Sequence, residues 1–556
     1  MNLQSRTIRH GVVLGAIVAT LAGCGSSTGS PVPSAAPSAA TAAPSGAAAS
    51  SGTAASSPSA PTAGSTYSLA FPRDTYTTET KTVTTSDGTS HEVTYHLYSA
   101  IPYVSKPVDV AYESLNVEVP VSIDGTAVDA SGAPIVLAIP VGGYMSSPVT
   151  GGMGSGPGGM PAGSAPGGGP GGALPSGMAP PSGNGGQAGF AGQSGSGNSD
   201  LALAAGYVVV TPGVRGRDNQ SADGTYYGKA PAAIVDLKAA VRYIRANAGV
   251  LPGNPDWIVS TGTSAGGALS ALLGASGDSS MYDAALAEIG AADASDAIFA
   301  AAAYCPITDL QHADAIYEWT FGTLPLRSGT VDATVSQELA AEFPAYVASL
   351  GLTTPEGTAI TADTYPQYLL TTFLEPAATT YLAALSEADR TSYLATNPWI
   401  TWANGQATFT WADFLAHLGT RSKSAPAFDA FDLSTAENIE FGDATTNARH
   451  FTDYSLRKAT GDASSTIGAD LQAIVDMMNP TYFIEASNPG AAKSWFLRVG
   501  TSDTDTSPAV VGDLAAALAG NGASVDGLMY WDAGHGANQD SAAFIAWIAS
   551  TTGYAK

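Results

Sequence analysis

Cysteine is almost absent from this chain of 556 residues, which contains only Cys24 and Cys305. Two cysteines exclude the framework of several disulfides that holds many small secreted domains together. Basic side chains are also scarce, because 21 Lys and Arg stand against 47 Asp and Glu and give a formal net charge of −26. Such an acidic chain has little with which to neutralise phosphates, so we expect no nucleic-acid partner.

Motifs for metals and phosphates are missing too. The sequence contains no Cys-x-x-Cys pair, no His-Glu-x-x-His and no glycine loop ending in Lys-Ser or Lys-Thr. We therefore expect chemistry that uses no metal ligands and no cofactor.

The N-terminus has the features of an export signal. Arg6 and Arg9 precede an apolar run over residues 12–21, which is too short to cross a bilayer of about 30 Å as a helix. The run ends in Leu21-Ala22-Gly23-Cys24, which resembles a bacterial lipobox, where the cysteine becomes acylated. We interpret residues 1–24 as a lipoprotein signal peptide and Cys24 as the lipidation site, which predicts an exported, membrane-anchored protein of the cell envelope. A plain signal peptide with a chance cysteine, and hence simple secretion, is the alternative.

Two stretches of low complexity interrupt the chain. Residues 25–66 are almost entirely Ser, Ala, Gly, Pro and Thr, which bury too little apolar surface to offset the entropy of ordering, so we predict a disordered tether. Residues 146–199 are rich in Gly, Pro, Ser and Met. We interpret them as a disordered surface insertion, with a mobile flap over the site as the alternative.

The remaining sequence alternates between strand-like and helix-like patterns. Such alternation predicts a parallel sheet covered by helices on both faces, with ligands bound beyond the carboxyl ends of the strands. The predicted strands are residues 134–141, 207–210, 257–261, 299–304, 495–499 and 528–531, and the predicted helices are residues 230–248, 510–518 and 542–549. The alternation fails over 311–489, which is rich in aromatics and contains helix-like stretches such as 381–393. We predict a cap or lid domain there, inserted into a catalytic domain made of residues 67–310 and 490–556.

The motif Gly262-Thr263-Ser264-Ala265-Gly266 directly follows a predicted strand and opens a predicted helix. A nucleophile elbow requires this strand, sharp turn and helix, with glycines two residues on either side of the serine because larger side chains would collide. We predict that Ser264 is a catalytic nucleophile. The backbone amide of Ala265 should form one half of an oxyanion hole, and Gly143, in the glycine loop after residues 134–141, should supply the other.

A serine hydroxyl needs a base and an orienting acid. Of the seven histidines, His535 alone lies in a glycine-flanked loop after the last predicted strand. A fold with a nucleophile elbow presents its catalytic histidine at this place, and His450 is the second candidate. Asp503 and Asp505 both follow the preceding strand; we favour Asp503 as the acid, while the other aspartate could be a carboxylate at a helix N-terminus. Cys305 ends an apolar run and is interpreted as a core residue.

The catalytic region resembles the bacterial tannases (tannin acyl hydrolases) of the single-chain type, from about residue 95 to residue 554 without the insertion. Residues 228–231, 236–243 and 425–429, the elbow with Gly267, and Phe441-Gly442 carry the resemblance, together with residues 499–501. It implies an α/β-hydrolase fold with Ser264, Asp503 and His535 as the triad. It also implies that Lys423, Glu437 and Asp505 hold the phenolic hydroxyls of a galloyl group.

The resemblance further implies an esterase that cleaves galloyl esters and depsides of tannins and releases gallate, with a small polyphenol ester as its partner molecule. A related carboxylesterase with a different acyl pocket, such as a feruloyl esterase, is the first alternative. A non-catalytic surface-binding protein that kept the fold is the second.

Overall fold

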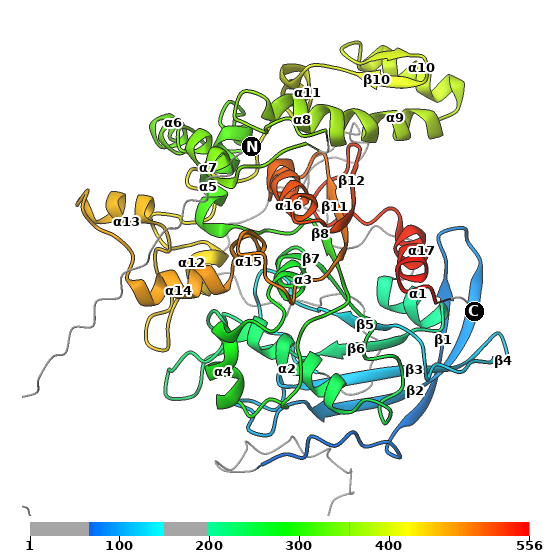
Figure 1. Ribbon diagram of the computed structural model, residues 1–556. Helices are drawn as coiled ribbons and strands as arrows, with labels where there is room; N and C mark the ends of the chain where they lie inside the picture. The colour runs from blue at the N-terminus through cyan, green and yellow to red at the C-terminus, as the bar shows by residue number, and fades with distance from the viewer. Residues whose placement is uncertain (1–65, 150–196, 355, 555–556) are drawn as a thin grey trace, which may run out of the picture. The chain divides into compact units, whose positions relative to one another are not determined.

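A ten-stranded sheet crosses the protein in the order β1-β2-β3-β6-β5-β7-β8-β11-β12, with β4 beside β3 (Figure 1). The computed structural model describes residues 66–149, 197–354 and 356–554. Six neighbouring strands are parallel, and these are the six predicted ones: β6 (Val208–Pro212), β5 (Ile135–Ala138), β7 (Ile258–Thr263), β8 (Ala300–Tyr304), β11 (Ser494–Gly500) and β12 (Ser524–Tyr530). The predicted α/β-hydrolase fold is therefore confirmed.

An antiparallel edge that the sequence reading did not anticipate extends the sheet. It consists of β1 (Thr77–Thr84), β2 (Ser90–Pro102), β3 (Ser114–Ile123) and β4 (Thr126–Ala127). β3 pairs antiparallel with β6 and so joins this edge to the parallel strands. In β2, Val93, Tyr95 and Leu97 are buried, whereas Thr94 and His96 between them are only partly buried, which is the two-residue period of a half-covered strand.

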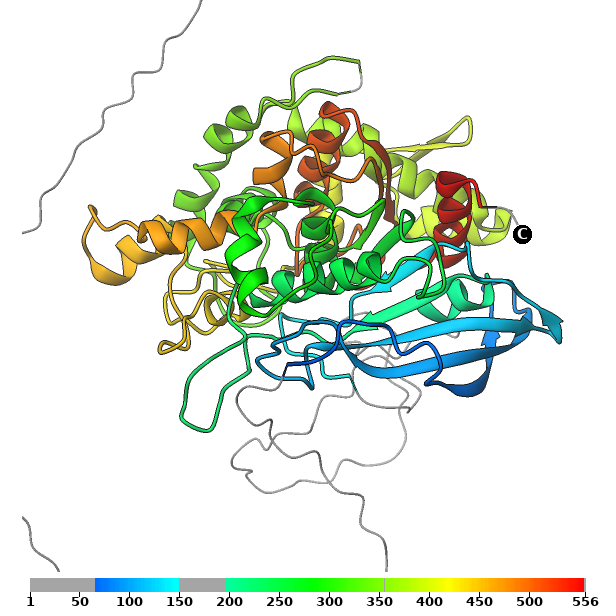
Figure 2. The ribbon, with the colours of Figure 1, turned by 60° about the horizontal axis from the view of Figure 1, so that its bottom comes forward.

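Helices cover both faces of the sheet (Figure 2). One hydrophobic cluster includes α2 (Ala232–Ala246), α3 (Ala265–Ala275), α15 (Pro480–Glu485) and α16 (Pro508–Gly520), and a second includes α1 (Asn198–Ala204) and α17 (Ser541–Thr552). Alternate alanines of β8 face the two clusters, since Ala301 and Ala303 belong to the first and Ala300 and Ala302 to the second. A strand covered on both faces reads as a continuous apolar run.

The 311–489 segment is mostly helical. It contains most of α5 (Leu310–Phe321), then α6 (Ala333–Ala340), α7 (Phe343–Leu350), α8 (Tyr365–Leu369), η2 (Leu370–Leu374), α9 (Glu375–Ala384), α10 (Glu387–Thr396), the hairpin β9 (Thr401–Ala403) and β10 (Gln406–Thr408), α11 (Trp411–Leu418), α12 (Ala436–Glu440), α13 (Asp453–Thr460), α14 (Ala469–Met477) and α15. Between β7 and β8 lie η1 (Ser280–Tyr282) and α4 (Asp283–Glu288). Both η2 and α9 contact the edge strand β12, and α8 contacts α16 (Figure 1).

One helical stretch differs from its prediction. Residues 381–393 are not a single helix, because Leu385 is extended (ψ 149°) between α9 and α10. The Ser386 side chain then caps α10 by accepting a hydrogen bond from the backbone N–H of Asp389. Serine is a preferred N-cap residue because its side-chain oxygen accepts a hydrogen bond from a backbone N–H of the first turn, so a new helix begins here.

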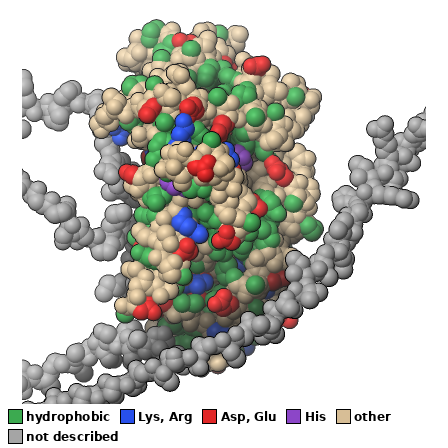
Figure 3. All heavy atoms as spheres, turned by 90° about the vertical axis from the view of Figure 1, so that its left-hand side faces the viewer, with side chains coloured by type: hydrophobic (Ala, Val, Ile, Leu, Met, Phe, Trp, Pro, Cys, Tyr) green, Lys and Arg blue, Asp and Glu red, His purple; other side chains and the backbone are tan. Residues whose placement is uncertain are grey.

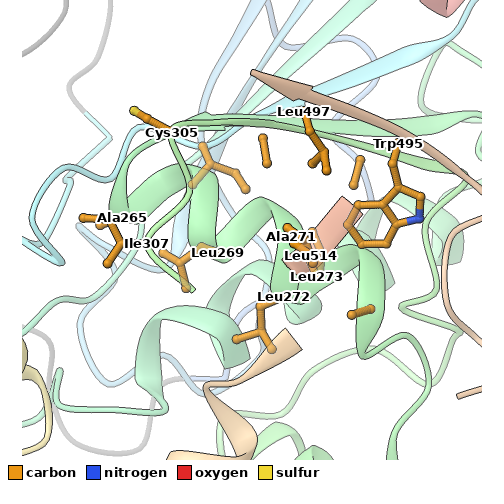
Figure 4. Packing of buried hydrophobic residues seen from close by; sticks show 14 of the residues in the cluster. Ala265, Leu269, Ala271, Leu272, Leu273, Cys305, Ile307, Trp495, Leu497 and Leu514 are labelled. Carbon is orange, nitrogen blue, oxygen red and sulfur yellow. The ribbon is translucent and has the colours of Figure 1, made fainter. Parts of the chain in front are cut away.

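The helix that follows the elbow rests on a dense apolar layer (Figure 4). Leu269 and Leu272 of α3 belong to the same buried cluster as Trp495 and Leu497 of β11. A Cβ placed on Gly274 would lie 2.8 Å from both the Ala301 Cβ and the Trp495 ring. Only glycine lets α3 approach the sheet this closely, and this packing fixes the height of the elbow above the strands.

Among the described residues, no helix is both long enough and apolar enough to span a membrane. On the face shown in Figure 3, Lys and Arg side chains are scattered among acidic, apolar and polar ones. The predicted signal peptide with Cys24, the predicted tether up to residue 65 and residues 150–196 of the predicted insertion lie outside the described part of the chain.

Candidate active site

Ser264 occupies the sharp turn between β7 and α3. Its backbone has φ 87° and ψ −112°, a conformation that costs a non-glycine residue on the order of 1–3 kcal/mol. A Cβ on Gly262 would lie 2.2 Å from the Gly266 carbonyl oxygen, and one on Gly266 would lie 2.7 Å from that of Val141. The flanking glycines are thus required by contact, and the serine hydroxyl is held above the turn as an elbow demands.

The structure brings Ser264, His535 and Asp503 together. The Ser264 Oγ lies 2.8 Å from the His535 Nε2, and the His535 Nδ1 lies 2.8 Å from the Asp503 Oδ2. The Asp503 carboxylate is fully buried, and its other oxygen accepts hydrogen bonds from the backbone N–H groups of Asp505 and Thr506. A carboxylate can only accept, so Nδ1 carries the proton and Nε2 is free to accept one from the serine.

The surroundings of His535 favour its protonated form. Burial alone would lower the pKa of His535, but the charge of Asp503 and its hydrogen bond outweigh burial and raise the pKa above the usual 6.5. The protonated form of the imidazole is therefore stabilised. Cys305, one residue after β8, lies with its Sγ 4.0 Å from the His535 Nε2, and burial raises the pKa of its thiol.

His450, the second candidate for the base, has a different place. Its Nδ1 lies 2.7 Å from the buried carboxylate of Asp429. That carboxylate also accepts hydrogen bonds from the Asn438 side chain, the Phe451 and Thr452 backbones and the Thr452 hydroxyl. His450 belongs to this structural network, as does Asn438.

The loop that carries Gly143 is clamped beside the elbow. Gly143 and Tyr144 have φ of 54° and 56°, and the loop reaches α3 through the close approach of the Val141 carbonyl to Gly266. The Arg217 Nε donates to the Gly143 carbonyl oxygen (2.7 Å), and the Arg217 N–H donates to the Tyr144 carbonyl oxygen (2.9 Å). The orientation of the peptide units around Gly143 therefore depends on Arg217, which the sequence did not single out.

Lys423 lies on a loop whose backbone is held by Arg421. The Arg421 Nε donates to the Lys423 carbonyl oxygen (2.8 Å), and the Arg421 guanidinium forms a fully buried two-pronged ion pair with Glu318. The Lys423 side chain is half-buried, and its Nζ lies 3.8 Å from the centre of the Phe428 ring. The ammonium is thus held over an aromatic face.

The buried carboxylate of Asp314 fixes the backbone stretch to which the helix of Glu437 is attached. Asp314 accepts hydrogen bonds from three successive backbone N–H groups, those of Ala427, Phe428 and Asp429. Burial raises the pKa of Asp314 to about 7, against the effect of these three donors. The Thr435 hydroxyl, which lies next to α12, donates to the Phe428 carbonyl oxygen and so ties the start of that helix to the same stretch.

The Glu437 carboxylate itself is buried and near the oxyanion loop. Only 5% of Glu437 is exposed, and no hydrogen bond to its carboxylate is present among the described residues. Burial, followed by the charges of Glu437 and Glu440, raises the pKa of Tyr144 well above 10. Burial also raises the pKa of Glu440 to about 8. A polar ligand that donates a hydrogen bond would therefore find an unused acceptor at Glu437.

Asp505 connects the triad to the Lys423 loop. Its backbone N–H donates to the Asp503 Oδ1, and its own carboxylate contacts the Ser422 hydroxyl at 2.9 Å. Ser422 directly precedes Lys423 in the chain. The three residues that the family resemblance assigns to galloyl recognition therefore lie on segments that contact the triad or one another.

A second His–Asp pair, which the sequence reading missed, fixes the loop that carries His535. The Asp532 carboxylate contacts the His417 Nε2 of α11 (2.6 Å) and accepts a hydrogen bond from the Tyr393 hydroxyl of α10 (2.5 Å). The Trp531 indole donates to the same Tyr393 oxygen, and its ring stacks on His417. Asp532 has φ 56°. Helices of the 311–489 segment thus hold the loop three residues before the base.

Comparisons with known proteins show which proteins this chain resembles. The family model described as BD-FAE, a family of α/β-hydrolases, matches residues 191–331. The esterase LipQ of Mycobacterium tuberculosis is 41% identical over 88 residues, which cover 16% of this chain and 20% of that esterase.

Solved structures give a match over nearly the whole described chain. The tannase of Fusobacterium nucleatum is 33% identical, with a TM-score of 0.71 over 87% of this chain and 99% of that one. The tannin acyl hydrolase of Lactobacillus plantarum is 32% identical, with a TM-score of 0.69 over 87% and 98%. A tannin acyl hydrolase in complex with ethyl gallate is 33% identical, with the same TM-score and the same coverage. The chain therefore belongs to the bacterial tannases, a family of carboxylic ester hydrolases built on the α/β-hydrolase fold.

Proposed function

We propose that this protein hydrolyses galloyl esters and depsides of tannins and releases gallate through an acyl-enzyme on Ser264. The observation that carries the proposal is the contact of the Ser264–His535–Asp503 triad with the Asp505 and Lys423 segments. Family membership supports it, as do relatives that were solved with ethyl gallate and with 3,4-dihydroxybenzoate.

The reaction follows from the triad geometry. The Ser264 Oγ attacks the ester carbonyl carbon while its proton passes to the His535 Nε2. The backbone amides of Ala265 and Gly143 stabilise the oxyanion, and each such donor contributes on the order of 3 kcal/mol. Collapse breaks the bond to the alcohol, which takes the proton from His535. Water then attacks the acyl carbon and gives a proton to His535, and the second tetrahedral intermediate breaks its bond to the Ser264 Oγ, which takes that proton from His535 as gallate leaves.

Recognition of the acyl group follows from the charges at Lys423, Glu437 and Asp505. A galloyl ring carries three adjacent hydroxyls, each of which donates and accepts. Carboxylates accept their protons strongly, and an ammonium donates to their oxygens. A ring without hydroxyls would leave these groups unpaired, which costs a factor of roughly 10⁴ in kcat/KM.

The substrate range tests the proposal. We expect kcat/KM for methyl gallate to exceed that for methyl benzoate by roughly 10⁴-fold and that for methyl ferulate by a large factor. Equal values for the three esters would remove the galloyl specificity and leave a general esterase. A preference for methyl ferulate would identify a feruloyl esterase instead.

Two variants with matched controls test the acyl pocket. Lys423→Ala and Glu437→Gln should each lower kcat/KM for methyl gallate by about 100-fold, the loss expected for a hydrogen bond to a charged group. Both should leave 4-nitrophenyl acetate within a few-fold, because acetate has no hydroxyls. Lys458→Ala and Glu338→Gln, at an exposed ion pair, are the controls and should change neither activity. Equal losses on both substrates would contradict the assigned roles.

A fluorophosphonate probe tests the serine mechanism without a substrate. Only an activated serine reacts with such a probe, so labelling should map to Ser264 and disappear in Ser264→Ala. That variant should also lose about 10⁶-fold in kcat. An unlabelled wild type would instead favour a protein that kept the fold without catalysis.

We further propose that the protein is exported and anchored in the membrane through an acylated Cys24. The lipobox-like Leu21-Ala22-Gly23-Cys24 sequence supports this proposal. Labelled palmitate should enter the wild type and not Cys24→Ser, and the variant should leave the membrane fraction. Equal labelling of both proteins would exclude Cys24 as the lipidation site.

A further inference from the structure

Cys305 has a position that ester hydrolysis does not explain. It follows the last residue of β8, and its backbone bends there to φ 38° while its N–H donates to the Arg498 carbonyl oxygen. Its sulfur points away from Leu497 and Trp495 of the apolar layer (Figure 4). The Sγ lies 4.0 Å from the His535 Nε2, the same atom that faces the Ser264 hydroxyl.

Three potential metal ligands lie together at this point. Potential ligand atoms of Cys305, His535 and Asp503 all lie within 4.8 Å of one another. Thiolate and imidazole are the ligands that Zn²⁺ and other soft divalent cations prefer. The Asp503 carboxylate already holds the His535 Nδ1, as carboxylates do behind the histidines that bind zinc.

The separation of sulfur and nitrogen fits one cation. A zinc ion lies about 2.3 Å from sulfur and about 2.1 Å from nitrogen, so tetrahedral bonds place these two ligands about 3.6 Å apart. The observed 4.0 Å needs a shift of only a few tenths of an ångström. The Ser264 hydroxyl, 2.8 Å from the same nitrogen, and water can complete four ligands. The imidazole is 22% exposed, which leaves a path for an ion from solvent.

We propose that Cys305 and His535 form an inhibitory site for one Zn²⁺ or Cd²⁺ ion at the catalytic base. Binding breaks the S–H bond of Cys305, forms a metal–sulfur and a metal–nitrogen bond, and releases one proton to solvent. No oxidation is involved. The Nε2 then has no lone pair for the serine proton, so ester hydrolysis stops until a chelator removes the ion. This effect on activity rests on the proposed role of His535, whereas binding of the ion does not.

The test titrates the full-length enzyme with chloride salts of Cd²⁺, Zn²⁺ and Mg²⁺ and follows hydrolysis of methyl gallate. Cd²⁺ and Zn²⁺ should abolish activity, EDTA should restore it, and Mg²⁺ should have no effect because it prefers oxygen ligands. Cys305→Ala and Cys305→Ser should keep basal activity and raise the half-inhibiting concentration of Cd²⁺ at least 30-fold. Cys24→Ser is the matched control and should be inhibited like the wild type.

A second readout does not depend on activity. A cadmium–thiolate bond absorbs in the ultraviolet by charge transfer, so Cd²⁺ should produce this band at one equivalent in the wild type and in Cys24→Ser, and not in Cys305→Ser. Equal inhibition of the wild type and both Cys305 variants would overturn the proposal, as would a missing band. If the protein hydrolyses no ester but shows the band, the proposed function fails while the metal site stands.

Discussion

Replacing Asp513 of α16 with asparagine should make the stability of the protein less dependent on pH. The Asp513 carboxyl is buried where α16 meets α7 and α8: it accepts a hydrogen bond from the Tyr365 hydroxyl (2.5 Å) and lies 3.4 Å from that of Tyr346. The single proton of Tyr346 has a nearer acceptor, Asp309, at 2.8 Å. A proton on Asp513 itself therefore completes the network, and burial raises the pKa of Asp513 to about 8.

The size of the effect follows from proton linkage. An aspartate in an unfolded chain has a pKa near 4, so between about pH 4 and pH 8 the folded state binds about one more proton than the unfolded state. The free energy of unfolding should fall as the pH rises, by about 1.4 kcal/mol per pH unit and by at most about 6 kcal/mol over the window. Asparagine has the shape of the neutral acid and cannot ionise, so Asp513→Asn removes this contribution.

Urea unfolding of the wild type and Asp513→Asn at several pH values between about 4 and 8 measures the difference. The two proteins should have similar stability near pH 4, and the variant should be more stable by several kcal/mol near pH 8. Asp256→Asn, at a carboxylate that is 83% exposed, is the control and should give a flat difference. A flat difference for Asp513→Asn, or a less stable variant near pH 8, would refute the reasoning.

Three further predictions concern catalysis. The His535 Nε2 must be unprotonated to act as the base, and Asp503 raises the pKa of His535. The acid limb of the pH profile, where kcat/KM falls as the pH is lowered, should therefore have its midpoint above pH 6.5. Asp503→Asn should move that limb to lower pH and reduce kcat by about 10⁴-fold. Arg217→Ala frees the Gly143 carbonyl and should lower kcat by about 10–100-fold with KM within a few-fold, since it disturbs only the oxyanion donors. Asp532→Asn weakens the hold on the His535 loop and should lower kcat by about tenfold, with labelling by a fluorophosphonate slowed in parallel.

Each of these variants has a control or an excluded outcome. Arg245 lies in the last turn of α2, where its guanidinium donates to the Ala297 carbonyl oxygen. Arg245→Ala should therefore leave kcat unchanged. Asp470→Asn, on the exposed first turn of α14, should do the same. An acid limb that stays in place in Asp503→Asn would contradict the tuning of the base. A rise in KM without loss of kcat in Arg217→Ala or Asp532→Asn would mean that these residues act on substrate binding instead.

The parallel half of the fold could be predicted because each of its elements is decided locally. Strands buried on both faces are continuous apolar runs, as in Ala300–Tyr304, and in α2 the large apolar residues Ile234, Leu237, Val241 and Ile244 recur at the helical period. The antiparallel edge could have been found as well. The alternation of Val93, Tyr95 and Leu97 in β2 has the two-residue period of a strand with one covered face.

The positions of Ser264 and His535 could be predicted because the elbow and the glycine-flanked loop follow directly from strands. The supports of the site could not, since they join residues far apart in the chain. Glu318 pairs with Arg421 across 103 positions, and Asp314 binds backbone groups 113 to 115 positions away. The hydrophobic periodicity of a sequence does not reveal such long-range pairs, and the residue types alone suggest charged side chains in solvent. Lys423 and Glu437 became candidates only through the resemblance to a family.

The hold of Tyr393 and His417 on Asp532 has a consequence for engineering. A chimera that replaced the 311–489 segment with the corresponding part of another hydrolase would leave Asp532 without both partners, even if every triad residue were retained. The His535 imidazole would then shift relative to Ser264, and kcat would fall although the residues of the acyl pocket were unchanged. Transplants that alter substrate range should therefore carry a tyrosine and a histidine at these two positions together.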